Sequence, residues 1–188
     1  MLTVSPKPGI PSSSSAKTLL QGLRVAASLS GAGYSQSQFP HWITISPKCD
    51  TRETVLQRDG VNVQTDTACA AIAGTWHSPY DGATWTQASD VDIDHMVPLQ
   101  NAWISGAQLW TTDQRRAFAN DLERPQLWAV TDNVNESKGD RSPDLWKPPL
   151  ASFWCTYAES WVRVKSFYAL TVTAAEKQAL ADMLNTCA

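Results

Sequence analysis

The stretch DVDIDHMVPLQNAW, residues 90–103, places one histidine, His95, behind three aspartates within six positions. Apolar and polar residues alternate over 91–97, which predicts a β-strand, and Pro98 ends it because proline has no backbone N–H for a ladder bond. Buried carboxylates without partners cost several kcal/mol each. An ordinary core strand is therefore not expected, and His95 becomes the first candidate for a functional group.

The residues downstream predict a second strand and a short helix. QLWAV (126–130) has the composition of a strand, and NVNESKG (133–139) that of a helix for which Asp132 can serve as the cap. A helical stretch, TDQRRAFAND (112–121), separates the two strands. The order strand, insertion, strand, helix thus spans about residues 91–140.

The bulk composition indicates one domain. The chain has 188 residues, 43% of them hydrophobic, and 9 tryptophans, which is enough to bury a single core. Residues 1–16, rich in Pro and Ser, predict a flexible N-terminal arm, and the domain is expected over 17–188. Leucine and alanine spacing predicts a first helix over about 16–29. No apolar run approaches the roughly 18 residues of a membrane helix, so no membrane segment is expected.

Three further helices flank the central unit. Asp50 can cap a helix over 51–58, and residues 60–90 have the composition of loops and short strands. Two helices close the chain, one over 155–170 and one over 173–187, and the second begins with a capping-box pattern. The short turn between them predicts antiparallel packing.

The four cysteines, at positions 49, 69, 155 and 187, lack the spacings of zinc sites. An even count at wide spacing predicts two disulfides and a secreted, extracellular protein; four buried free thiols are the alternative. The antiparallel terminal helices bring Cys155 beside Cys187, which leaves Cys49 with Cys69, and each bridge would contribute on the order of 3 kcal/mol. The N-terminal residues lack the layout of a signal peptide, so a secreted form would have lost its signal.

The net charge of −3 is unevenly distributed. Residues 91–147 contain nine acidic and six basic residues, whereas the segments before and after are balanced. This pattern argues against a broad basic nucleic-acid face and fits a local cluster that holds a divalent cation. A solvated acidic loop region is the alternative.

His95 and the segment NVNESKGDR (133–141) supply complementary chemistry. A histidine suits proton abstraction near neutral pH. Mg²⁺ takes few protein oxygens and keeps several waters, which leaves room for a phosphate oxygen. The carboxylate of Asp94 and the amide oxygen of Asn135 would form an adequate set of ligands.

The alternation of a strand raises a difficulty for this site. Asp94 and His95 point to opposite faces of an ideal strand, so both can serve one site only where the strand ends or twists. Pro98 is consistent with an early end. Asp92 is expected to be solvated or structural.

Seven blocks of the sequence match the pattern of a known family: GYSQSQFPHW (33–42), CDTRETVLQRDG (49–60), GTWHSPYDG (74–82), DIDHMVPLQNAWISGAQLW (92–110), RRAFANDL (115–122), NVNESKGDRSPDLWKPP (133–149) and CTYAESWVRVKSFYAL (155–170). Through them, and above all through DHMVPL followed by NxxK, the chain from about residue 18 resembles the secreted bacterial and fungal nucleases of the HNH type. The resemblance implies an α+β fold, in which a single domain with flanking helices is built around one ββα-metal unit.

The resemblance also implies roles for residues of the unit. His95 corresponds to the general base, Asp94 and Asn135 to metal ligands, and Lys138 to a phosphate contact. Asn135 then fills the last position of the HNH name, and Asn120 is the candidate for the middle one. The implied cofactor is a divalent metal, Mg²⁺ first and Mn²⁺ or another divalent ion as alternatives, and the implied products carry 5′-phosphate ends.

Other side chains are candidates that also have an ordinary structural interpretation. The resemblance extends to Arg52 and Glu53 of CDTRE as residues that reach the site, but Glu53 also suits a cap and Arg52 a surface ion pair. Three arginines are either phosphate contacts or surface charges: Arg115, Arg116 and Arg141. A zinc site of His95 with His41 and His77 is not favoured, because both lie in aromatic, turn-rich segments.

The leading expectation is a secreted, monomeric, metal-dependent endonuclease that acts on DNA, with RNA as the second candidate substrate. Little sequence preference is expected, because the metal contacts the nucleic-acid backbone rather than the bases. A catalytically inactive binding or effector module on the same scaffold is the alternative from another class. A hydrolase of small phosphodiesters is a third hypothesis.

Overall fold

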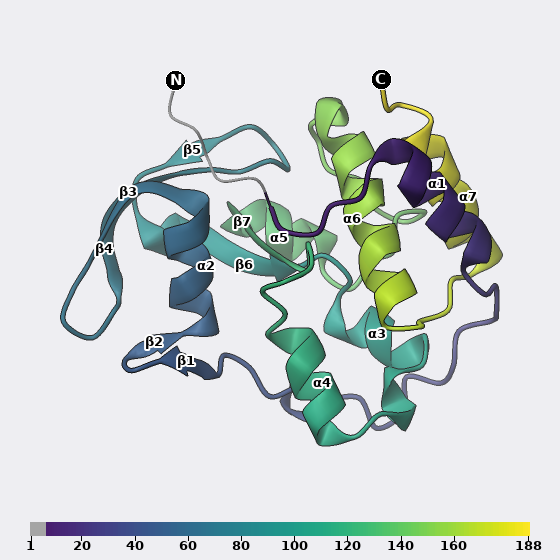
Figure 1. The fold of residues 1–188 in the computed structure, drawn as a ribbon, viewed down its shortest axis with the longest axis horizontal. Coiled ribbons are helices and arrows are strands. Elements are labelled where there is room, and N and C mark those ends of the chain that lie inside the picture. The colour runs from purple at the N-terminus through teal and green to yellow at the C-terminus, as the bar shows by residue number, and fades with distance from the viewer. Residues whose placement is uncertain (1–6) are drawn as a thin grey trace.

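A central antiparallel hairpin consists of β6 (Val91–His95) and β7 (Leu127–Thr131), and helix α5 (Asp132–Lys138) follows β7 directly (Figure 1). The computed structural model describes residues 7–188. The predicted order of strand, insertion, strand and helix is confirmed, within an α+β domain. The boundaries of these three elements lie within two residues of the predicted ones.

The remaining elements surround this hairpin. The helices are α1 (Ser13–Gly22), α2 (Thr51–Asp59), α3 (Leu99–Ile104), α4 (Thr112–Ala119), α6 (Trp154–Phe167) and α7 (Ala174–Leu184). The strands are β1 (Thr44–Ser46), β2 (Cys49–Asp50), β3 (Gly60–Thr65), β4 (Ala71–His77) and β5 (Thr84–Trp85). In the described part of the chain, every helix is too short or too polar to span a bilayer.

The hairpin lies between two layers. Helices α1, α6 and α7 pack against one another on one side, and α2 with the β3–β4–β5 sheet lies on the other (Figure 1). Trp128 and Val130 of β7 belong to the large core of the helical layer, whereas Leu127 and Ala129 belong to a smaller core with α2 and β4. Burial on both faces explains why β7 reads LWAVT, an almost continuous apolar run.

The two faces of the hairpin separate the acids of β6 from its histidine. Asp92 and Asp94 are paired across the hairpin with Val130 and Trp128, so their side chains share the face of the large core. His95 is paired with Leu127 and shares the face of the small core. The expectation that Asp94 and His95 point to opposite faces is therefore confirmed.

Both predicted disulfides, Cys49–Cys69 and Cys155–Cys187, are present. The second joins the start of α6 to the residues after α7, as expected for antiparallel helices.

The predicted cap of α5 is wrong, because Asp132 is the first helical residue and makes no capping bond. The helix begins directly after β7, which leaves no turn for a cap.

The predicted first helix is displaced. α1 begins three residues earlier than expected, where the Ser12 hydroxyl accepts the Ser15 N–H at 3.3 Å, so part of the predicted arm is helical. It ends at Gly22, because the backbone at Val25 forms a parallel bridge with Val172 instead of continuing the helix. Residues 1–6 of the predicted arm lie outside the described residues.

A buried carboxylate joins the N-terminal segment to the hairpin. Lys7, within the predicted flexible arm, forms an ion pair with Asp59 at the end of α2, and its Nζ lies 4.9 Å from the Trp128 ring centroid. Asp59 also accepts from Arg58 Nε at 2.7 Å and from the Ala129 N–H at 3.0 Å. Burial alone would raise the pKa of Asp59, but the Arg58 hydrogen bond and the charges of Lys7 and Arg58 outweigh it and lower the pKa.

Replacing Asp59 with Asn should lower the free energy of unfolding by about 2 kcal/mol at neutral pH, because hydrogen bonds to charged groups contribute roughly that much. The folded-state pKa of Asp59 lies below the ordinary value of 3.8. The contribution of the carboxylate is therefore complete above that value and is lost as the pH falls through the folded pKa. Urea unfolding of both proteins at neutral pH and in strong acid measures the difference, and a difference that does not shrink in acid would contradict this role.

Candidate active site

A cleft of about 520 Å³ runs along the free edge of β6. Within residues 7–188, β6 pairs only with β7, so its other edge is open and four consecutive residues, Asp92 to His95, line the cleft. The other walls come from α2, α5 and the segment before β1, and include Arg52, Asn135, Glu136, His41 and Trp42. Asp94 and His95 therefore reach one cleft from opposite faces of the strand, because the strand ends at His95.

Asp94 forms a buried ion pair with Lys138. Lys138 Nζ donates to both carboxylate oxygens of Asp94, at 2.9 and 2.8 Å, and to the His95 carbonyl at 2.8 Å. The Tyr80 hydroxyl donates to the same carboxylate. Burial raises the pKa of Asp94 and lowers the pKa of Lys138, and the charge of each partner opposes that effect on the other.

This arrangement corrects the role predicted for Lys138. Its side chain has no exposed surface and its ammonium donates to three protein acceptors, so it does not offer a contact to a phosphate. Lys138 instead ties α5 to the end of β6. Tyr80, whose hydroxyl completes the environment of Asp94, was not singled out from the sequence.

Asn135 lies beside Asp92. Its Nδ2 donates to Asp92 Oδ2 at 3.0 Å, and its Oδ1 makes no hydrogen bond to any described residue. Sequence reasoning missed this contact, although the two-residue spacing of Asp92 and Asp94 puts both on one strand face. Negative charge is concentrated at this end of α5, where the charge of Asp92, with smaller contributions from Glu136 and Asp90, raises the pKa of Asp132.

The His95 ring is held on three sides. Its Nε2 lies 2.9 Å from the Ala119 carbonyl oxygen; because a carbonyl only accepts, Nε2 carries the proton and Nδ1 is the basic nitrogen of the neutral ring. The Trp42 indole stacks on the ring, with centroids 5.2 Å and planes 3° apart, and His41 meets it edge-on at 5.5 Å. Burial, helped by the charges of His41 and Lys138 and opposed by the Ala119 bond, lowers the pKa of His95 to about 3. The ring is therefore neutral at neutral pH, with its Nδ1 lone pair free of hydrogen bonds to the described residues, and the same burial weakens it as a base.

The contacts of His41 and Trp42 with His95 come from the FPHW block, whose local role the sequence did not reveal. His77, by contrast, is exposed at the end of β4, where its Nδ1 lies 3.1 Å from the Thr84 hydroxyl, and it does not line the cleft. The disfavoured zinc site of three histidines is therefore not assembled.

Arg52 and Glu53 are neighbours at the start of α2. Arg52 lines the cleft, and its Nη2 donates to the carbonyls of Ala88 and Val91, both at 3.2 Å. The Glu53 carboxylate accepts from Arg52 Nη1 at 3.0 Å and from the Ala71 N–H at 2.8 Å. Glu53 thus supports Arg52 and does not complete a capping box.

The three other arginines considered for phosphate contacts do not line the cleft. Arg115 is buried, and its guanidinium donates to the carbonyls of Gln38 at 2.8 Å and Trp110 at 2.5 Å, so it is neither a phosphate contact nor a surface charge. Arg116 and Arg141 are exposed; one pairs with an acid of its own helix and the other donates to a carbonyl of α5. Both are surface charges in this arrangement.

Asn120, the candidate for the middle Asn of the HNH name, is buried and does not line the cleft. Its Oδ1 accepts from the Ile43 N–H at 3.1 Å and from the Thr51 hydroxyl at 2.7 Å, and its Nδ2 donates to the Pro40 carbonyl at 2.8 Å. The two residues between Pro40 and Ile43, which contact His95, are therefore fastened to the end of α4.

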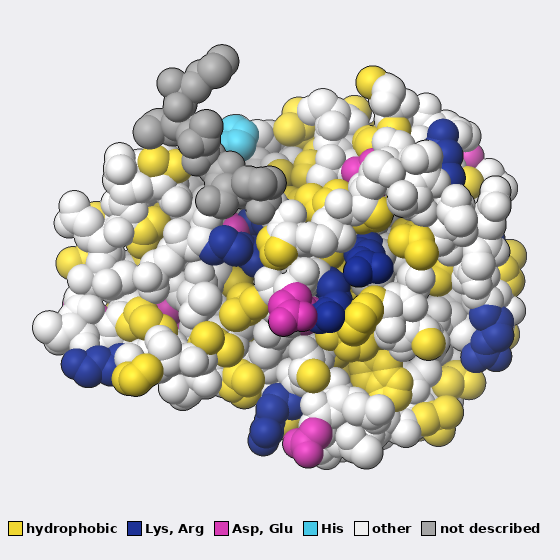
Figure 2. Space-filling model, in the orientation of Figure 1, with side chains coloured by type: hydrophobic (Ala, Val, Ile, Leu, Met, Phe, Trp, Pro, Cys, Tyr) yellow, Lys and Arg dark blue, Asp and Glu magenta, His cyan; other side chains and the backbone are white. Residues whose placement is uncertain are grey.

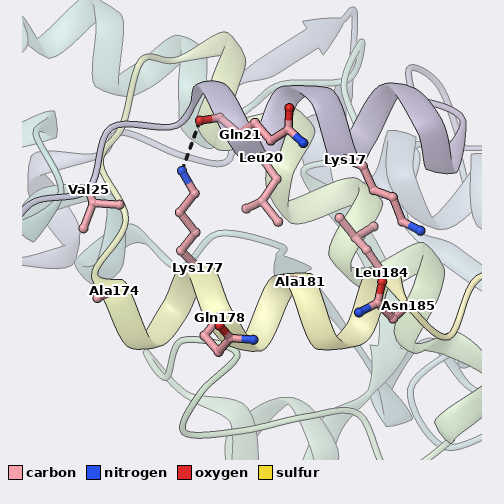
Figure 3. Close-up of a pocket in the computed structure, with 10 residues that line it drawn as sticks. All are labelled: Lys17, Leu20, Gln21, Val25, Ala174, Lys177, Gln178, Ala181, Leu184 and Asn185. Atoms are coloured by element: carbon pink, nitrogen blue, oxygen red, sulfur yellow. Dashed lines mark hydrogen bonds between the residues drawn. The ribbon is translucent and has the colours of Figure 1, made fainter.

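A second groove, of about 490 Å³, lies between α1 and α7 (Figure 3). Leu20 and Leu184 supply apolar surface, and Lys177 reaches across to donate to the Gln21 carbonyl at 3.1 Å (Figure 3). No carboxylate or histidine is among the described residues that line it. This groove therefore offers neither a general base nor ligands for a hard cation.

The surface charges agree with the expectation from the sequence that there is no broad basic face. On the face shown in Figure 2, Lys and Arg side chains form separate groups rather than one continuous patch. Among the lining residues of the cleft, Arg52 is the single Lys or Arg, against four acids: Asp92, Asp94, Glu136 and Asp140. A polyanion would meet excess negative charge there unless a cation were bound.

Comparisons with known proteins found a family and a relative to which the chain is similar. The sequence model of a family described as "GmrSD restriction endonucleases, C-terminal domain" matches residues 50–183, which include the hairpin and α5. A relative from Arthroderma benhamiae, described as an "Uncharacterized secreted protein", is 66% identical over 180 residues, which cover 96% of this chain and 88% of the relative. No solved structure matches the chain.

The predicted extracellular location is confirmed by the description of this relative and by the two disulfides. The family match covers well over half of the chain and spans both strands of the hairpin and the helix that follows them. The chain therefore belongs to the family of the C-terminal domain of GmrSD restriction endonucleases, which is a nuclease family.

Proposed function

We propose that the protein is an HNH-type, metal-dependent endonuclease that hydrolyses phosphodiester bonds of DNA or RNA and leaves 5′-phosphate ends. The observation that carries the proposal is that one cleft unites a neutral histidine, His95, with an amide–carboxylate pair, Asn135 and Asp92, on a strand–strand–helix unit. Membership of a nuclease family supports a nucleic-acid substrate and suggests a divalent metal.

The oxygen donors of the cleft fit a hard divalent cation. Asn135 Oδ1 has no hydrogen-bond partner within residues 7–188, and Asp92 and Asp94 contribute carboxylates to the same cleft. Mg²⁺ prefers such oxygens and Mn²⁺ accepts the same set. Of the two predicted ligands, Asn135 offers a free amide oxygen, whereas both carboxylate oxygens of Asp94 already accept from Lys138. Asp92, which forms no ion pair with a described lysine or arginine, is the carboxylate that is available to a cation. A bound cation would supply positive charge to a non-bridging phosphate oxygen and to the leaving 3′ oxygen.

His95 is the proposed general base. Its Nδ1 takes a proton from the attacking water, while the Nε2–H remains on the Ala119 carbonyl and keeps the tautomer defined. The water oxygen bonds to phosphorus, the bond to the 3′ oxygen breaks, and that oxygen takes a proton from solvent. General base catalysis of this kind contributes roughly 10²–10⁴ in rate.

Arg52 is the proposed phosphate contact. It is the Lys or Arg side chain that lines the cleft, and Glu53 and two backbone carbonyls hold it in place. Contacts to phosphate carry no direct sequence information, so little sequence preference is expected. We retain the monomer as part of the proposal.

Supercoiled plasmid incubated with the protein should be nicked and then linearised in Mg²⁺ or Mn²⁺, and excess EDTA should stop the reaction, because the acidic cleft needs a cation to accept a phosphate. Gel electrophoresis with a panel of divalent ions measures this, and end labelling identifies the 5′-phosphates. If both the plasmid and a single-stranded RNA stay intact with every ion, the enzyme is rejected and the inactive binding module is favoured.

Replacing His95 with Ala should lower kcat by about 10²–10⁴-fold, since the base is lost. Circular dichroism should show an unchanged fold. His77→Ala is the matched control, because His77 is exposed and does not line the cleft, and this variant should keep full activity. Undiminished cleavage by His95→Ala would exclude the assigned base.

The two carboxylates of β6 should respond differently to conversion into amides. Asp92→Asn should weaken Mn²⁺ binding by about 10–100-fold, which is the range typical of residues around metal sites. Calorimetry measures this affinity, and the free energy of unfolding should change little. Asp94→Asn should lower the free energy of unfolding by about 3–5 kcal/mol, because it leaves the buried Lys138 ammonium without its carboxylate. Unchanged metal affinity in Asp92→Asn would remove Asp92 from the ligand set.

A further inference from the structure

The FPHW block, residues 39–42, has no part in the proposed chemistry, yet it supplies two of the three contacts of the His95 ring. Trp42 covers one face of the ring with nearly parallel planes, and His41 meets the ring edge-on. The third contact is the Ala119 carbonyl, which accepts from Nε2. The ring is thus bounded by two side chains of one segment and by the end of α4.

The end of α4 organises all three contacts. Ala119 binds the His95 ring directly, and the next residue, Asn120, holds the backbone on both sides of Trp42 through the Pro40 carbonyl and the Ile43 N–H. Because adjacent residues of one helix end hold both the ring and its cover, the indole and the imidazole keep a defined relative position. A flat stack within 3° of parallel is consistent with that constraint.

Trp42 is also held by the small core. It packs against the small core formed by α2, β4 and the hairpin, as Trp85 does. A histidine ring has a broad torsional preference about its Cβ–Cγ bond, so a single hydrogen bond at Nε2 leaves the ring plane poorly determined. A large, packed indole removes that freedom by filling the space into which the ring would turn.

We propose that Trp42 is a positioning residue that holds the His95 ring in its reactive orientation and does so without contact to the phosphate. This inference rests on the proposed function, because it assigns a role relative to the general base. Misplacing a reactive group by about 1 Å can cost on the order of 10²-fold in rate. A residue that acts only through the general base alters the rate of the chemical step, so the effect is expected on kcat and not on KM.

The kinetic test compares three variants. Trp42→Leu should lower kcat by about 10–100-fold with KM nearly unchanged, and Trp42→Phe should recover most of the activity because it retains an aromatic face. Trp85→Leu is the matched control, because Trp85 packs against the same small core but does not stack on the His95 ring. It should keep kcat despite a comparable loss of stability.

A spectroscopic test does not depend on turnover. The chain has three histidines, and the ring signals of His95 in an NMR spectrum are identified by their loss in His95→Ala. The indole ring current should displace these signals in the wild type. Trp42→Leu should abolish the displacement, Trp42→Phe should keep part of it, and Trp85→Leu should leave it unchanged.

The outcomes separate this inference from the proposed function. Inactive wild-type protein would overturn the nuclease proposal. His95 ring signals that are the same in the wild type and in Trp42→Leu would show that the indole does not stack on the ring, and would overturn the inference whether or not the protein is active. Full kcat in Trp42→Leu beside an inactive His95→Ala would overturn the positioning role alone. A rise in KM at unchanged kcat, or an equal loss of kcat in Trp85→Leu, would overturn it as well.

Discussion

The ion pair between Lys138 and Asp94 sets the relation of α5 to β6. A buried ammonium costs several kcal/mol unless its donors are satisfied, and here two carboxylate oxygens and the His95 carbonyl accept from Nζ. Asn135 lies one turn earlier on the same face of α5, as Asp92 lies two residues earlier on the same face of β6. The NxxK spacing on the helix thus matches the DxD spacing on the strand, and the ion pair brings Asn135 to Asp92.

The open edge of β6 explains how one cleft gathers groups from both faces of a strand. The acids face the helical layer and His95 faces the small core, an arrangement that a strand paired on both edges would bury. Because β7 is the one strand that pairs with β6 in the described part of the chain, consecutive residues of β6 reach solvent where the strand ends. Arg52 adds a cation from α2, and its carbonyl contacts tie that helix to the start of β6.

Local signals predicted most of the fold. These signals depend on neighbours in the chain or on one short turn. They are the alternation over the first strand, the proline after it, the Asp50 cap and the helix ends that bring the cysteines together. The prediction was wrong at the N-terminal segment. There α1 stops because residue 25 pairs with Val172, and Lys7 is held by Asp59, partners that sequence periodicity does not reveal.

The same division applies to the candidate site. The sequence by itself determined that His95 and Asn135 belong to one strand–strand–helix unit, because their motifs are short and their order is unambiguous. Only the tertiary structure decided that Asn135 contacts Asp92, that Lys138 is a buried tie, and that Trp42 covers His95. These contacts join residues more than forty positions apart, and their roles depend on burial, which arises from the packing of elements that no local pattern records.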